Sequence, residues 1–136
     1  MADAPDEDRT PVDPALFRAL AADPLAAHLG IELTDVRPGY ARATMTVAPH
    51  LLNSVGTAHG GATMALLDVV HSAVSNSHGT VAVAQDVHTE FLSAGRPGDQ
   101  LDAQVGGERV RGQGPEQGRV DGRAVLVRGV GHDQRL

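Results

Sequence analysis

The sequence predicts an α+β domain in which one antiparallel sheet curves around one long helix. Three observations favour this class. Residues 40–47 alternate between apolar and polar side chains, residues 59–76 form an apolar stretch with helical spacing, and further strand-like runs follow that stretch. The chain has 136 residues, a length that fits one compact domain with one main site.

The beginning of the chain divides into a tail and a helix. Residues 1–14 carry five acids and three prolines, so we expect a flexible acidic tail before a single domain at residues 15–136. Apolar residues over 15–29 follow a helical spacing. Pro24 should interrupt this helix, and Gly30 should end it.

A hairpin is expected next. Residues 31–36 are typical of a strand, and Pro38-Gly39 is a turn dipeptide. In residues 40–47, small apolar side chains occupy every second position, which predicts a second strand with one buried face. A polar loop containing glycine then spans residues 49–57.

The most informative stretch begins at His59. After Gly60 and Gly61, apolar residues recur at helical spacing up to Asn76, and a glycine three residues later supplies a stop signal. The predicted helix is apolar on nearly every side, as expected for a helix enclosed by a sheet. Asp68 is the only acid within it.

Later strands are predicted at residues 80–91, 101–110 and 123–130. Residues 111–122 are rich in Gly, Gln and Arg and show no clean alternation. We therefore predict no strand in that interval, although the preceding strands need a neighbour there.

Composition argues against several classes of protein. A formal net charge of −6 and the absence of Lys argue against a nucleic-acid partner. The absence of Cys excludes disulfides and thiolate catalysis, and no apolar run approaches the roughly 18 residues of a membrane span. Because the acidic start is also unlike a signal peptide, we expect a cytoplasmic protein without membrane partners.

The composition also bears on subunit association and on binding of phosphorylated ligands. Aromatic residues are few, and a core of small side chains in a chain of this size predicts that subunits associate. Several arginines cluster late in the chain and could form a patch for a phosphorylated small molecule, although a solvated surface is the commoner outcome: Arg109, Arg111, Arg119, Arg123 and Arg128.

Asp68 is the first candidate for a catalytic group. A carboxylate within an apolar helix is costly unless it is paired or used. Near a bound carbonyl carbon it could act as a general base on water or as a nucleophile. The alternative is an acid on an exposed stripe of the helix.

Gly60 and Gly61 are the second candidate group. Residues without side chains at a helix start leave backbone N–H groups open to an acyl oxygen, and the helix dipole adds positive potential there. This is the arrangement of an oxyanion hole. The alternative is a glycine pair that serves only a tight turn.

Three polar residues complete the candidates. His59 could hydrogen-bond a substrate carbonyl, orient the loop or only cap the helix. Asn53 could hold water or the acyl carbonyl, although Asn in a loop is more often a turn former. Ser72 lies one turn after Asp68 and could hydrogen-bond the carboxylate, although Ser within a helix is usually a packing residue.

Several short motifs occur at fixed spacing over residues 25–105: Leu52-Asn53, Thr57-Ala58-His59-Gly60-Gly61, Ala65-Leu66-Leu67-Asp68, Asn76-Ser77, Ala82-Val83-Ala84, Thr89-Glu90-Phe91-Leu92 and Gly98-Asp99. This set resembles the phenylacetate-degradation branch of the hotdog-fold thioesterase superfamily. The spaced His-Gly-Gly and Asp are its most specific part. The resemblance implies a hotdog fold and hydrolysis of an acyl-CoA.

The resemblance also implies a site between subunits, in dimers that commonly pair into tetramers. Asp68 of one subunit faces His59, Gly60 and Asn53 of the other, and the amides of Gly60 and Gly61 hold the thioester carbonyl. The CoA thiolate leaves, and no metal or cofactor is needed because a thioester is already activated. Phenylacetyl-CoA, other aryl-CoAs and medium-chain acyl-CoAs are the implied substrates.

The sequence departs from the family pattern in two places. The family usually carries a proline where this chain has Ser93-Ala94, and its penultimate strand is degraded here at residues 111–122. The second departure affects the sheet edge and the CoA groove.

We expect Val55 and Met64 to line the substrate pocket together with Gly61 and Ser72.

Two other functions stay open at this point. A hotdog-fold enoyl-CoA hydratase would need an Asp–His dyad, and His71 lies three residues after Asp68. A non-catalytic acyl-CoA-binding module would bind the same ligands without turnover. The position of the His-Gly-Gly motif favours the hydrolase.

Overall fold

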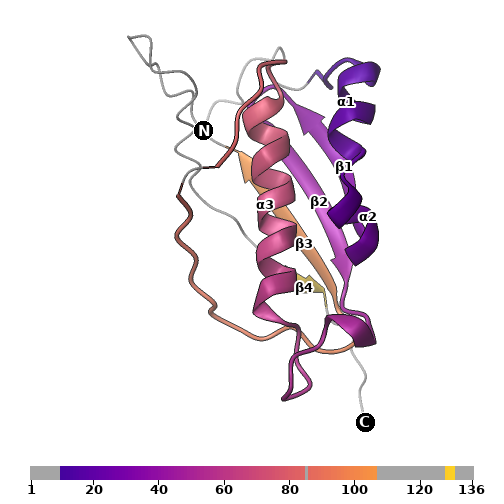
Figure 1. The fold of residues 1–136 in the computed structure, drawn as a ribbon, viewed down its shortest axis with the longest axis vertical. Helices are drawn as coiled ribbons and strands as arrows, with labels where there is room; N and C mark the ends of the chain where they lie inside the picture. Colours follow the sequence, from indigo (N-terminus) through magenta and orange to yellow (C-terminus); the bar gives the residue numbers. More distant parts are fainter. Residues whose placement is uncertain (1–9, 85, 107–127, 131–136) are drawn as a thin grey trace, which may run out of the picture.

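The structure is a computed structural model that describes residues 10–84, 86–106 and 128–130. Helices α1 (Pro14–Ala21) and α2 (Pro24–Leu29) precede strands β1 (Ile31–Arg37) and β2 (Tyr40–Thr46). A short 3-10 helix (Pro49–Leu51) leads to the long helix α3 (Gly60–Asn76). Strands β3 (Gln100–Gly106) and β4 (Arg128–Val130) follow (Figure 1).

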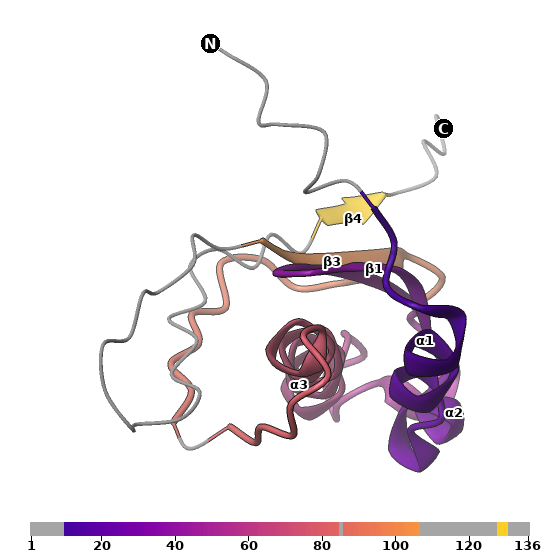
Figure 2. The same ribbon diagram turned by 90° about the horizontal axis from the view of Figure 1, so that it is seen from above.

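The four described strands form one antiparallel sheet in the order β1-β2-β3-β4. Ala43 in β2 lies opposite Leu33 in β1 and Ala103 in β3. Helix α3 crosses one face of this sheet (Figures 1 and 2). The α+β prediction, with a sheet against one long helix, is confirmed.

The buried face of the hairpin is the one that the alternation predicted. Ala41, Ala43 and Met45 are at most 1% exposed. They pack against the side of α3 that faces the sheet, together with residues of β3. The core is therefore made of small and medium aliphatic side chains: Val36, Val47, Leu66, Val70, Ala73, Leu101 and Val105.

Local signals account for the two short helices. The Asp13 carboxylate accepts a hydrogen bond from the Ala15 amide at 2.8 Å, and the Asp23 carboxylate accepts one from the Ala26 amide at 2.9 Å. Gly30 ends α2 with a φ of 72°. The predicted interruption at Pro24 and the stop at Gly30 are confirmed.

The prediction of a flexible tail at residues 1–14 is wrong for its last residues, which pack against the domain. Val12 is only 9% exposed, and its N–H donates to the carbonyl of Val36 at 3.0 Å. This short piece packs against β1 because Val12 is the one large apolar residue between Met1 and α1. Residues 1–9 lie outside the described part.

The strand predicted at residues 80–91 is wrong for the single chain. The described residues of this range, 80–84 and 86–91, belong to no strand of the sheet, and Val81 and Val83 are each 90% exposed. The described sheet has the order β1-β2-β3-β4, and the described residues of 80–91 pair with none of these strands. A strand-like run with apolar side chains predicts that a surface is buried, but it does not identify the partner that buries it.

The other late predictions are only partly covered. The strand predicted at 101–110 is confirmed as far as Gly106, and of the one predicted at 123–130 only residues 128–130 are described. Residues 111–122 lie outside the described part. So do all the late arginines except the backbone of Arg128.

Candidate active site

The start of α3 is organised by His59, which occupies the N-cap position. Its ring nitrogen Nδ1 accepts a hydrogen bond from the Gly61 amide at 2.9 Å, and its carbonyl accepts from the Ala62 amide at 3.0 Å. Because Nδ1 is the acceptor, the neutral ring carries its proton on Nε2. The His59 side chain is exposed, so the Nε2–H group can donate to a ligand.

The two glycines differ in what their amides do. The Gly61 amide is occupied by His59, whereas the Gly60 amide has no hydrogen-bond partner among the described residues. The expectation that both amides can hold a carbonyl oxygen therefore applies, in this structure, to Gly60. An added Cβ would lie 3.4 Å from the Phe91 ring at Gly60 and 3.1 Å from His59 Nδ1 at Gly61.

The Asn53 side chain makes its hydrogen bonds within its own loop. Its side-chain oxygen accepts from the amides of Val55 and Thr57 at 3.1 and 3.0 Å, and its Nδ2 donates to the Thr57 hydroxyl at 2.8 Å. These bonds are those of a turn former, which was the alternative interpretation. One Nδ2 hydrogen is left for a substrate. Val55 stands at the loop tip and is 79% exposed.

Asp68 lies on the side of α3 that faces away from the sheet, where it is exposed. The expectation of a carboxylate enclosed in apolar surroundings is wrong for the single chain. The reason is that the described sheet covers only one side of α3, and the residues buried on that side are Ala62, Leu66, Val69, Val70, Ala73 and Val74.

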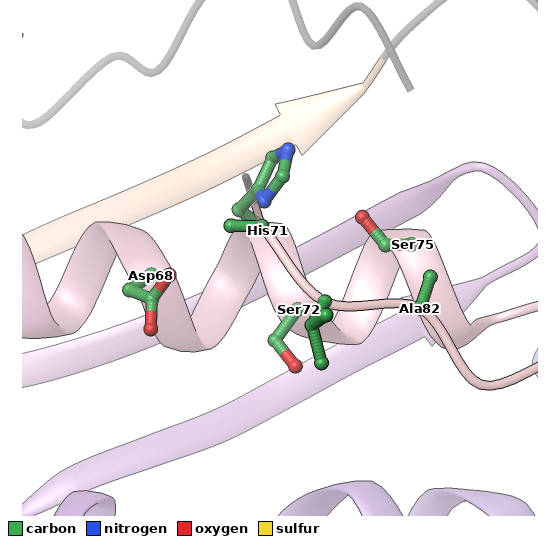
Figure 3. Close-up of a pocket in the computed structure, with 7 residues that line it drawn as sticks. Asp68, His71, Ser72, Ser75 and Ala82 are labelled. Carbon is green, nitrogen blue, oxygen red and sulfur yellow. The ribbon is translucent and has the colours of Figure 1, made fainter. Parts of the chain in front are cut away.

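A cavity of about 270 Å³ opens beside Asp68. One wall is the exposed side of α3, with Asp68, His71, Ser72 and Ser75, and the other is the extended stretch Ala82, Val83 and Ala84. Figure 3 shows the Asp68 carboxylate and the Ser72 hydroxyl on the same side of the helix. No hydrogen bond joins these two described side chains in the structure.

Sequence reasoning missed part of this wall. Ser75 was not singled out, and His71 was considered only for a hydratase. A usable signal existed, because positions 68, 71, 72 and 75 share one helix face by their spacing. The wall at residues 82–84 had no local signal, since its approach to α3 depends on contacts distant in sequence.

The candidate residues thus fall into two groups within the chain. His59, Gly60 and Gly61 gather at the helix start, whereas Asp68 and Ser72 lie about two turns further along. The predicted pocket residues Val55 and Met64 do not line the cavity. Met64 is half-buried on α3 between the two groups.

Comparisons with known proteins agree with this architecture. A family model described as the thioesterase superfamily matches residues 55–113. The acyl-coenzyme A thioesterase PaaI of Escherichia coli strain K12 is 37% identical over 99 residues, which is 73% of this chain and 69% of that protein.

Solved structures give the same result. The E. coli PaaI protein from the phenylacetic acid degradation operon has a TM-score of 0.66 and 35% identity, with 75% of this chain and 72% of that chain covered. A thioesterase from Streptococcus pneumoniae TIGR4 in complex with coenzyme A has a TM-score of 0.60 and 28% identity, with 66% and 70% covered. This chain belongs to the thioesterase superfamily and has its hotdog fold.

Proposed function

We propose that this chain hydrolyses an acyl-CoA to the free acid and CoA, at a site that two copies of the chain build together. Asp68 of one copy acts on the thioester carbon. Gly60, His59 and Asn53 of the other copy hold the carbonyl oxygen. Similarity to a protein named as an acyl-coenzyme A thioesterase supports thioester hydrolysis, and the roles of these residues are those that the family resemblance implies.

The observation that carries the shared site is the distance along α3. Gly60 precedes Asp68 by eight residues, which corresponds to about 12 Å of rise along a helix. The carbonyl bond of a thioester is only about 1.2 Å long. The two groups of one chain therefore cannot serve the same thioester, whereas two α3 helices related by a twofold axis could bring Gly60 of one copy opposite Asp68 of the other.

The surface that a second copy would cover supports the same arrangement. Large apolar side chains of residues 81–92 are exposed, with exposed fractions of 51–90%: Val81, Val83, Val87, Phe91 and Leu92. Exposed apolar surface on an unpaired extended segment is typical of an interface between chains. Dimers of this kind, or tetramers built from two dimers, would also enclose Asp68.

The chemistry needs few groups. Asp68 takes a proton from water while the water oxygen bonds to the carbonyl carbon, or its carboxylate attacks that carbon directly and water releases the acyl group afterwards. The Gly60 amide and the positive end of the α3 dipole stabilise the oxyanion, and the CoA thiolate leaves. Because a thioester is already activated, this scheme uses no metal or bound cofactor.

The substrate class rests on the comparisons. One relative is named an acyl-coenzyme A thioesterase, and a similar thioesterase was solved with coenzyme A. Phenylacetyl-CoA, other aryl-CoAs and medium-chain acyl-CoAs are the candidates, with no nucleic-acid or membrane partner. No helix in the described ranges has both the length and the apolar character to cross a bilayer. We place the enzyme in the cytoplasm, where acyl-CoAs are available.

Release of free CoA thiol from a panel of acyl-CoAs tests the activity. Replacing Asp68 by Asn or Ala should lower kcat by about 10²–10⁴-fold, because the base or nucleophile is lost. The matched control is Glu32→Gln on the outer face of β1, which removes an exposed carboxylate far from the cavity and should leave kcat unchanged. Formation of a water adduct with CoA retained would support a hydratase, and binding without turnover would support a sensing module.

A second test addresses the sharing of the site. Gly60→Pro removes the free amide at a helix position where proline is tolerated, and Gly60→Ala adds a Cβ but keeps the amide. We expect Gly60→Pro to lower kcat by about 10²–10³-fold and Gly60→Ala to have a much smaller effect. Residue 59 already has the extended backbone that precedes a proline, with ψ 132°.

Mixing the two inactive proteins distinguishes a shared site from a site within one chain. A hybrid dimer of the Asp68→Asn and Gly60→Pro chains contains one site in which both groups are intact. After subunit exchange at equal amounts, about a quarter of the wild-type activity should return. No recovery, in hybrids shown to form, would contradict a site shared between two copies.

A further inference from the structure

Asn76, the last residue of α3, connects the two walls of the cavity. Its Nδ2 donates to the carbonyl of Ser72 at 2.9 Å and to the carbonyl of Ala82 at 3.0 Å, and its Oδ1 accepts from the Ala82 amide at 2.8 Å. Ser72 belongs to the helix wall, and Ala82 begins the opposite wall. One half-buried side chain therefore spans the end of the cavity.

The contact with Ala82 has the form of a strand pairing. The side-chain amide of Asn carries one donor group and one acceptor, as a peptide group does. It meets both the N–H and the C=O of Ala82, so this residue is held as if it were paired in a ladder. From residue 80 to residue 94, with residue 85 left aside, Ala82 is the one residue whose backbone has hydrogen-bond partners among the described residues.

Among the described residues, the hydrogen bonds that hold this wall against the end of α3 therefore come from Asn76. At the other end of the segment, the next backbone hydrogen bond among the described residues is at Gly95, whose carbonyl accepts from the Ala58 amide at 2.9 Å. Gly95 sits tightly there, since an added Cβ would lie 3.1 Å from Ala58. Val83 and Ala84 follow directly after the Asn76 contact, and their distance from Asp68 is set by it.

The hydrogen bonds of Ser77 at the end of α3 are separate from the contact between Asn76 and Ala82. The Ser77 side chain is buried, its hydroxyl donates to the Val74 carbonyl at 2.7 Å, and it accepts from the Gly39 amide at 2.9 Å. These bonds tie the end of α3 to the turn between β1 and β2. They satisfy the helix end without reaching the cavity.

We propose that Asn76 is a positioning residue that fixes the width of the substrate cavity by holding Ala82 against the end of α3. The inference rests on the proposed function, because it takes the cavity beside Asp68 as the place where the substrate binds. Asn76 does not touch the reacting atoms. Its loss should therefore weaken binding of the substrate more than it slows the chemical step.

Asn76→Asp is the informative variant, because it keeps the shape and the acceptor for the Ala82 amide. It loses the donor and sets a carboxylate oxygen against the carbonyls of Ser72 and Ala82. With the best acyl-CoA of the panel, we expect KM to rise about tenfold and kcat to change less than about twofold. Hydrogen exchange of the Ala82 amide should become at least about tenfold faster.

Ser77→Ala is the matched control, since it removes the neighbouring tie between the helix end and the fold. It should lower the Tm but leave KM and the exchange of the Ala82 amide unchanged. A rise in KM that both variants share would reduce Asn76 to a structural role and overturn the proposal. So would an unchanged KM in Asn76→Asp.

The exchange measurement also keeps this inference distinct from the proposed function. It is made on the protein without substrate, so it reports the hold on Ala82 whether or not any acyl-CoA is hydrolysed. A wild-type protein without thioesterase activity would refute the proposed function alone. Ala82 exchange that Asn76→Asp leaves unchanged would refute the positioning role alone.

Discussion

Strand β2 and the extended segment at residues 80–94 have opposite surroundings, although the sequence predicts a strand in both. Residues 40–47 alternate between apolar and polar side chains, and residues 80–91 form a strand-like run. In β2 the apolar side chains of Ala41, Ala43 and Met45 are at most 1% exposed. In the segment, Val81 and Leu92 are each 90% exposed.

The difference lies in the neighbours rather than in the pattern. β2 pairs along its whole length with β1 on one side and β3 on the other, and α3 covers its apolar face. The segment is tied at Ala82 and at Gly95 and is unpaired between them among the described residues. Figure 1 shows it passing beside α3 without joining the sheet.

This difference supports the proposal that a second copy of the chain covers the segment. A segment of this composition is costly to leave in water, because each large apolar side chain gains about 1.5–3 kcal/mol when it is buried. In the proposed dimer, a second copy covers this segment and also supplies Gly60 to the site. Stability of the subunit and assembly of the enzyme should therefore depend on different segments.

A charge in β2 should have the largest effect. Ala43→Asp places a carboxylate at a position that is 0% exposed, between β1 and β3 and under α3. An unpaired buried charge costs several kcal/mol, so we expect the free energy of unfolding to fall by at least about 4 kcal/mol. Urea unfolding followed by circular dichroism, at fixed protein concentration, measures it.

Thr46→Asp on the same strand is the control, because its side chain is exposed. It should change the free energy of unfolding by no more than about 0.5 kcal/mol. Equal effects of the two substitutions would mean that β2 does not have the buried face described above.

The sequence predicted the parts of the fold that depend on neighbours in the chain. Pro24 and Gly30 bound the short helices, and Pro38-Gly39 turns β1 into β2, because each conformation is set by one or two residues. The helix at residues 60–76 followed from its apolar spacing. Residues 80–91 were mispredicted because strand pairing depends on a partner that local sequence does not name.

The site divides in the same way. The helical spacing located Asp68, and the glycines were placed correctly at the helix start. The exposure of Asp68 agrees with the alternative of an acid on an exposed stripe of the helix, and the sequence left both open because the outcome depends on which side of α3 the sheet covers. The contact from Asn76 to Ala82 was also out of reach, since a side chain that replaces a strand partner has no sequence signature of its own.

A charge in the extended segment should have a smaller and different effect. Leu92→Asp alters a side chain that is 90% exposed, so the subunit itself should remain folded. If a second copy buries this residue, the dissociation constant of the assembly should rise at least about tenfold. Sedimentation equilibrium measures the dissociation constant, and thiol release should fall in parallel as the shared site is lost.

Leu25→Asp provides the matched control, because it introduces the same change on α2, on the other side of the molecule, where Leu25 is 57% exposed (Figure 1). General effects of an added charge on solubility or folding should appear in both variants, whereas weaker assembly should appear only with Leu92→Asp. An assembly that tolerates Asp at position 92 would assign the interface to another surface. A partner other than a second copy would then have to cover the exposed apolar residues of the segment.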